Sequence, residues 1–145
     1  MKDAKWWIEK YPFLMVKDNS AYPWIEVNST EEHWFTDLPT GWVNSFGEKM
    51  CDELLEALGK YVDDFIIVQT KEKYASLRMY WYWREREYSA EEENDIKQVG
   101  MDVQDIIYKY EKISYNTCIR CGAQATHYSE PWILPYCEKC FNEQK

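Results

Sequence analysis

The sequence predicts an α+β fold, in which a β-hairpin or small antiparallel sheet packs on two amphipathic helices and a zinc ribbon closes the C-terminus. Three observations predict it: two stretches with apolar residues at helical spacing, β-rich runs between them, and four cysteines in two Cys-x-x-Cys pairs. A chain of 145 residues can bury about 68–70% of the surface of its unfolded state, which is enough for a hydrophobic core.

The first 40 residues have the least regular pattern. A short helix is expected at 3–10, because Tyr11 and Pro12 end it, and two apolar runs follow at 13–16 and 22–27. Either run could be a strand, since periodicity alone does not settle segments this short.

The stretch after Thr40 predicts an amphipathic helix. Every fourth residue is apolar, and Gly59 stands where the end of a helix favours a residue that adopts positive φ. The apolar stripe consists of Trp42, Phe46, Met50, Leu54 and Leu58. Cys51 lies beside this stripe and is expected to be a buried, unreactive thiol.

Two β-rich runs, 65–70 and 77–83, predict a β-hairpin. Side chains alternate between the two faces of a strand. The face expected to be core holds Leu77, Met79, Trp81 and Trp83. The opposite face holds Arg78, Tyr80, Tyr82 and Arg84.

A second, longer helix is predicted to follow Ser89. Ser89 and Glu92 form a capping box, and apolar residues then recur at intervals of three and four. This stripe consists of Ile96, Val99, Val103, Ile106, Ile107, Tyr110 and Ile113. The acidic residues 91–93 fall in the first turn, where the helix dipole favours carboxylates.

The four cysteines of the C-terminal segment predict a metal site. Cys118-x-x-Cys121 and Cys137-x-x-Cys140 are separated by 15 residues, a spacing typical of structural zinc. Two residues between cysteines let one turn direct both thiolates at a single ion, and Gly122 gives the first turn its backbone freedom. We expect one structural Zn²⁺ per chain, because four thiolates leave no open position for chemistry. Redox-active or disulfide-bonded pairs are the less favoured interpretation.

Charge divides the chain into an acidic α+β domain, 1–115, and a zinc-ribbon module, 116–145. The first part has 23 acidic and 14 basic residues, and the second has three of each. A net charge of −9 repels phosphates, so we expect no direct binding to double-stranded nucleic acid and favour a basic protein surface as partner. No apolar run approaches ~18 residues, which predicts a cytoplasmic protein without membrane contact.

No catalytic constellation is predicted, and we expect the protein not to be an enzyme. His33 has no nucleophile motif near it, and glycine motifs that bind phosphate are absent from the sequence. The candidate partner-binding residues are Glu91, Glu92, Glu93, Asp95, Tyr80, Tyr82 and Trp132.

Three segments together resemble a group of small proteins from phages and bacterial mobile elements. They are VQTKEKYASLRMYWYW at 68–83, YEKISYNTCIRCG at 110–122 and YCEKC at 136–140. That group has a Lys-Glu-Lys-aromatic-x-x-Leu-Arg hairpin and a C-terminal four-cysteine zinc module, and the resemblance covers roughly residues 42–141. Here Ala75 and Ser76 stand where glycines usually follow the aromatic residue.

A small, acidic, aromatic-rich protein of this kind is similar to anti-CRISPR proteins and other phage counter-defence inhibitors. The resemblance implies a non-enzymatic inhibitor that binds a CRISPR effector nuclease in the cytoplasm of the host cell and obstructs the loading of target DNA. The alternative is a regulatory zinc-ribbon protein that binds nucleic acid or nucleotides through the aromatic and arginine face of the hairpin.

Overall fold

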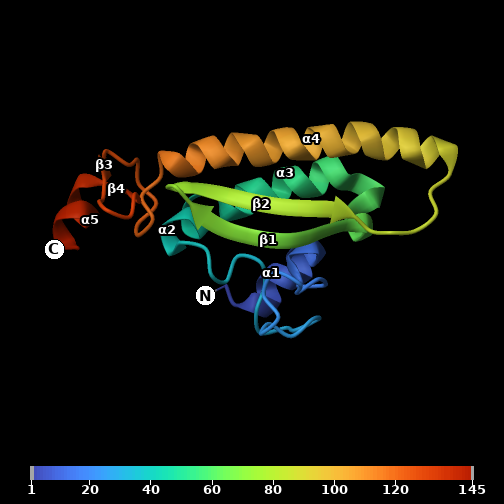
Figure 1. Ribbon diagram of the computed structural model, residues 1–145, viewed down its shortest axis with the longest axis horizontal. Helices are drawn as coiled ribbons and strands as arrows, with labels where there is room; N and C mark the ends of the chain where they lie inside the picture. The colour runs from blue at the N-terminus through green and yellow to red at the C-terminus, as the bar shows by residue number, and fades with distance from the viewer. Residues whose placement is uncertain (1, 145) are drawn as a thin grey trace.

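The computed structural model describes residues 2–144 and confirms the α+β class. Strands β1 (Phe65–Lys73) and β2 (Ser76–Trp83) form one antiparallel sheet, and the short strands β3 (His127–Tyr128) and β4 (Pro135–Tyr136) form another. Figure 1 shows the long helix α4 (Ala90–Tyr115) running beside the hairpin and helix α3 (Glu48–Leu58). The cysteine-rich segment lies at the end of the molecule that also holds the hairpin turn.

The hairpin is confirmed, and its strands extend beyond the predicted runs. Phe65 pairs with Trp83 at the open end, and Lys73 pairs with Ser76 beside the turn. The two turn residues, Tyr74 and Ala75, have φ of 52° and 71°. A two-residue turn of this kind needs positive φ and usually takes Asn or Gly. Here the turn forms without glycine.

The helix predicted after Thr40 contains a wide turn. It begins as α2 (Thr40–Trp42), continues through a π-helical segment, η2 (Val43–Gly47), and becomes α3, which ends at Gly59 with φ of 53°. All five residues of the predicted stripe are buried. A π-helical turn accommodates an extra residue, so it changes the direction of the side chains that follow it.

The N-terminal helix is confirmed as α1 (Ala4–Lys10), but the two possible strands of the first 40 residues are wrong. Phe13 and Leu14 belong to a short 3-10 helix, η1 (Pro12–Leu14), and residues 22–27 form turns and bends. The backbone N–H of Ile25 donates to the Tyr22 carbonyl, which bends the chain, and one isolated bridge joins Met15 to His33. Phe13, Leu14, Val16 and Ile25 are buried in the core, whereas Trp24 and Val27 are exposed.

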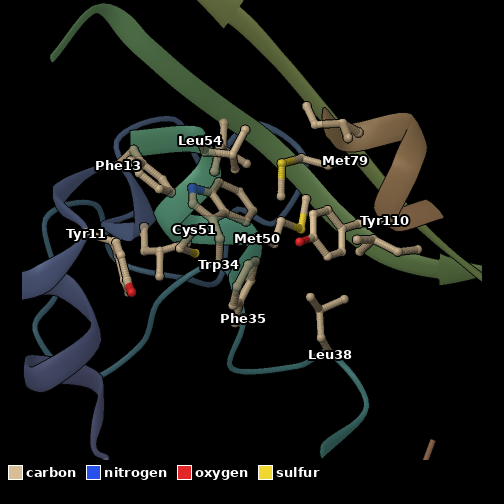
Figure 2. Close-up of a cluster of buried hydrophobic side chains, with 14 of the residues drawn as sticks. Tyr11, Phe13, Trp34, Phe35, Leu38, Met50, Cys51, Leu54, Met79 and Tyr110 are labelled. Carbon is tan, nitrogen blue, oxygen red and sulfur yellow. The ribbon is translucent and has the colours of Figure 1, made fainter. Parts of the chain in front are cut away.

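The core joins the N-terminal segment, α3, the hairpin and α4. Figure 2 shows aromatic side chains such as Tyr11, Phe13 and Trp34 around Met50 and Cys51. Cys51 is fully buried, as predicted, and burial raises the pKa of its thiol well above the ordinary value. This thiol is therefore held in its unreactive, protonated form.

Helix α4 begins with the predicted capping box. The Glu92 backbone N–H donates to Ser89 Oγ at 3.1 Å, and the Ser89 N–H donates to the Glu92 carboxylate at 2.9 Å. The predicted stripe packs on the core from Val99 to Tyr110, but at its C-terminal end Ile113 is 37% exposed and Ser114 is buried. Ser114 Oγ accepts from the Leu77 backbone N–H at 2.7 Å, so α4 also covers the free edge of β2. No helix within residues 2–144 is long and apolar enough to cross a membrane.

Candidate metal centre

The first cysteine pair lies in a tight knuckle directly after α4. The Cys118 backbone N–H donates to the Ala123 carbonyl at 2.8 Å, and the Gly122 N–H donates to the Cys118 carbonyl at 3.1 Å. Gly122 has φ of 83°, a conformation that favours glycine. The knuckle therefore turns Cys118 and Cys121 toward the same side of the backbone.

The second pair opens a helix. Cys137 precedes α5 (Glu138–Glu143) as its N-cap, and its Sγ accepts a hydrogen bond from the Cys140 backbone N–H at 3.4 Å. One turn of α5 then brings Cys140 to the sulfur of Cys137. Because this pair sits at a helix and the strands of the second sheet are two residues long, the zinc-ribbon topology expected from the sequence is not confirmed.

The four cysteine sulfurs converge, and all lie within 4.8 Å of one another. Among residues 2–144 this is the one group of His, Cys, Asp or Glu side chains placed to hold a metal ion. Four thiolates at about 2.3 Å from one ion would stand about 3.8 Å apart in a tetrahedron. Cys121 Sγ and Cys137 Sγ are 3.6 Å apart. The donor set and its spacing fit a tetrahedral, thiolate-bound ion.

The pKa values of two thiols in the cluster are shifted in opposite directions. Burial disfavours the Cys118 thiolate, but backbone N–H groups of Cys121, Cys137 and Arg120 outweigh burial and lower the pKa of Cys118 to about 6. Burial, together with the neighbouring thiols, raises the pKa of Cys140 to about 12. A dication changes this balance, because it favours the thiolate at every ligand.

The first knuckle, which holds Cys118 and Cys121, packs directly on helix α2, and the two backbones are in close contact. The Gly41 N–H donates to the Ile119 carbonyl at 2.8 Å, and Trp42 Nε1 donates to the Thr117 carbonyl at 2.9 Å. A Cβ added at Gly41 would lie 2.2 Å from the Cys118 carbonyl oxygen. Sequence reasoning missed this seat, because it joins residues about 75 positions apart and neither glycine nor tryptophan signals such a contact by itself.

Neither histidine belongs to the cysteine cluster. The His127 ring stacks on Phe141 with centroids 4.9 Å apart, and its Nδ1 lies 2.8 Å from Thr126 Oγ1. His33 is buried, and its Nδ1 accepts from the Phe35 backbone N–H at 3.2 Å. Burial lowers the pKa of His33 to about 4, so the ring is neutral at physiological pH.

The acidic candidates lie at the N-terminal end of α4. Glu92 is used by the capping box, and Asp95 accepts a hydrogen bond from Tyr61 Oη at 2.7 Å. Glu91 and Glu93 are exposed, and neither has an ion-pair partner among the described residues. They differ in this from Glu92, which pairs with Arg86, and from Asp95, which pairs with Lys60.

The tyrosines of the second strand face solvent. Tyr80 and Tyr82 are 45% and 42% exposed, in contrast to the buried Leu77 and Met79 of the other face. Tyr82 Oη also donates to Asp18 Oδ2 at 2.8 Å, which holds its ring against the N-terminal segment. The strand thus has the alternation that the sequence predicts.

The arginines near these tyrosines are neutralised within the chain. Arg78 Nη1 lies 2.7 Å from Glu111 Oε1, and Arg84 Nη2 lies 2.9 Å from Asp64 Oδ1. Two cations that could have contacted phosphates are therefore already paired with carboxylates.

Trp132 lies far from the acidic candidates. It is 81% exposed in the loop before β4, at the opposite end of α4, whose 26 residues span about 39 Å. With Tyr74 of the hairpin turn, 72% exposed, it lines a cleft of about 590 Å³ together with Glu72, Lys73 and residues 131–134. Tyr74 was not among the predicted site residues, although an aromatic residue at a hairpin turn signals an exposed ring.

The fold and the site define an α+β protein with a C-terminal four-cysteine centre packed on its second helix. Comparison with models of protein families, with curated proteins and with solved structures finds no match to this chain.

Proposed function

We propose that the four cysteines bind one Zn²⁺ per chain and that this ion is structural. The support is the convergence of four sulfurs and no other donor at tetrahedral spacing. A closed thiolate site supplies folding energy, because the unfolded chain holds no such site. Each pair would supply two of the four ligands, so the ion would join the first cysteine turn to the start of α5.

We further propose that the chain is a non-enzymatic inhibitor that binds a protein with a basic surface. In its most specific form, taken from the resemblance, it is an anti-CRISPR protein that binds an effector nuclease and obstructs target DNA. The observation that carries the binding role is the exposed pair Tyr74 and Trp132, which lie on the hairpin turn and on the loop before β4 and line one cleft. Large aromatic side chains in this position are typical anchors of protein interfaces.

The acidic end of α4 has a different role in this proposal. Exposed carboxylates outside the core of an interface speed association with a basic partner but contribute little to the lifetime of the complex. Glu91 and Glu93 would therefore steer the partner, while Tyr74 and Trp132 would hold it. The two effects are separable in kinetic measurements.

Nucleic-acid binding by the Tyr80 and Tyr82 face is the weaker proposal. Stacking platforms for single strands combine aromatic side chains with a positively charged groove. Here the arginines of that face are paired with Glu111 and Asp64. Net charge of −9 opposes the approach of phosphates as well.

The test is an inhibition assay with guide-loaded CRISPR effector nucleases. We expect a stable complex with one effector class and a decrease in the fraction of effector bound to labelled target DNA. Trp132→Ala should weaken the complex about thirtyfold, mainly through faster dissociation, as for an anchor worth about 2 kcal/mol. Undiminished DNA binding and cleavage across the effector panel, with no complex, would contradict the proposal.

Matched charge reversals separate steering from anchoring. The double variant Glu91→Lys and Glu93→Lys should slow association and reduce its dependence on salt, with little change in dissociation. Its control is Glu26→Lys with Glu31→Lys, which makes the same charge change at exposed positions of the N-terminal segment. Equal slowing of association by both double variants would show that only the net charge matters, and would contradict a specific role for the N-terminal end of α4.

A further inference from the structure

We propose that the four-cysteine centre is also an oxidation site, at which a peroxide joins Cys121 to Cys137 in a disulfide and releases the metal ion. The inference rests on the proposed metal centre and goes beyond its structural role. It assigns a chemical modification to two of the four ligands and a consequence to the Trp132 loop.

The four ligands differ in how well a small oxidant can reach them. Cys118 is 0% exposed and Cys140 is 6% exposed, whereas Cys121 is exposed and Cys137 is half-buried. The two accessible sulfurs are also neighbours, 3.6 Å apart. A thiol reacts with peroxide as the thiolate, the form that metal binding requires. Cys121 is therefore the first site of attack, and Cys137 is its partner.

The reaction balances with hydrogen peroxide as the oxidant. The Cys121 thiolate attacks one peroxide oxygen, the O–O bond breaks, and a sulfenic acid forms with release of hydroxide. The Cys137 thiolate then attacks the Cys121 sulfur, forms the S–S bond and displaces a second hydroxide. Two protons from solvent convert both hydroxides to water. The two thiolates lose two electrons, and the peroxide gains them.

The disulfide leaves Cys118 and Cys140 as the only thiolates of the centre, too few to complete a tetrahedral site. The loop that carries Trp132 depends on this centre, because it lies between Tyr128 and Cys137 and is closed by few local contacts. Its closing bonds are Ser129 N–H to the Leu134 carbonyl and Leu134 N–H to Ser129 Oγ, each at 3.1 Å, and Ser129 Oγ to the Trp132 carbonyl. Metal release should therefore loosen the Trp132 loop and weaken partner binding.

The test uses the full chain with its metal, treated with hydrogen peroxide beside a chromogenic zinc chelator. After quenching, free thiols are alkylated under denaturing conditions and the protein is cut with trypsin. Cleavage after Arg120 and Lys139 places Cys121 and Cys137 in one peptide, 121–139, whereas Cys118 and Cys140 fall in its two neighbours. A Cys121–Cys137 disulfide then appears as an unalkylated 121–139 peptide that is lighter by two hydrogens. Any other disulfide within the centre links two different peptides.

We expect one zinc released per chain, two thiols lost, and the unlinked 121–139 peptide as the main oxidised product. Dithiothreitol with added Zn²⁺ should restore the starting state. The control is Cys51→Ala, which removes a buried thiol outside the centre and should leave the rate of zinc release unchanged. Zinc retained under peroxide, or released with linked peptides instead, would overturn the oxidation site but leave the metal centre standing. Protein purified without any bound metal would overturn both.

Discussion

The space between α2 and the first knuckle is fixed at Gly41. A Cβ there would meet three backbone atoms of residues 118–120 at 2.2–2.8 Å. Backbone atoms cannot move aside as a flexible side chain can, because the knuckle is held by its own hydrogen bonds. Gly41 therefore sets how the C-terminal segment sits on the α+β body.

Gly41→Ala should lower the free energy of unfolding by ~3 kcal/mol or more, as overpacking between backbones does. The control is Gly59→Ala, which has φ of 53° but no atom within 4 Å of the added Cβ, and which should cost about 1–2 kcal/mol through backbone strain alone. Denaturant unfolding with zinc present measures both. Equal losses of stability in the two variants would contradict a tight contact between Gly41 and the backbone of the first knuckle.

Elements far apart in the sequence meet at one buried carboxylate, Asp64, at the end of the 3-10 helix η3 (Gly59–Asp64). Its oxygens contact Arg84 Nη2 and Arg86 Nε, each at 2.9 Å, and Arg86 Nη2 continues to Glu92 at 3.1 Å. This network ties the end of the helical segment to the loop after β2 and to the first turn of α4.

The pKa of Asp64 is lowered by the Arg86 hydrogen bond, against the effect of burial, with a further contribution from Arg84. Its contribution to stability is therefore present above the ordinary pKa of 3.8 and lost as pH falls through the lower folded value. Asp64→Asn should lower the free energy of unfolding by about 2 kcal/mol at pH 7. In urea titrations the difference in free energy of unfolding between the original protein and Asp64→Asn should shrink below pH 4. Acid would also release a bound metal ion, but from both proteins. A difference that stays constant with pH would contradict the network.

Elements with a local period could be predicted from the sequence, and the others could not. The capping box and the three- and four-residue spacing located α4, and alternation located the hairpin. The runs at 13–16 and 22–27 have no period, so their turns depend on contacts with the core that the sequence does not display. Ile113 was predicted to face the core, but Ser114 takes the buried position, because its hydroxyl accepts a hydrogen bond from the Leu77 N–H at the edge of β2.

On the scale of the whole molecule, the acidic candidates lie at the N-terminal end of α4, Tyr80 and Tyr82 lie along β2, and Trp132 lies in the loop before β4, so the candidate residues do not form one surface. The four-cysteine cluster was predictable because both pairs are local, and the structure brings all four sulfurs together. The seat on α2 and the Tyr74–Trp132 cleft were not, since each depends on packing between distant segments. The acidic residues of α4 and the Tyr74–Trp132 cleft are therefore best tested with separate variants.

A closed four-thiolate zinc centre, in which one ion joins the two cysteine pairs of the C-terminal segment, is the basis of the proposals above. Zinc K-edge X-ray absorption of protein purified without chelator tests it most directly. We expect stoichiometric zinc with four sulfur neighbours at about 2.3 Å and no nitrogen or oxygen ligand. Absence of zinc, or a first shell that contains oxygen or nitrogen, would contradict it.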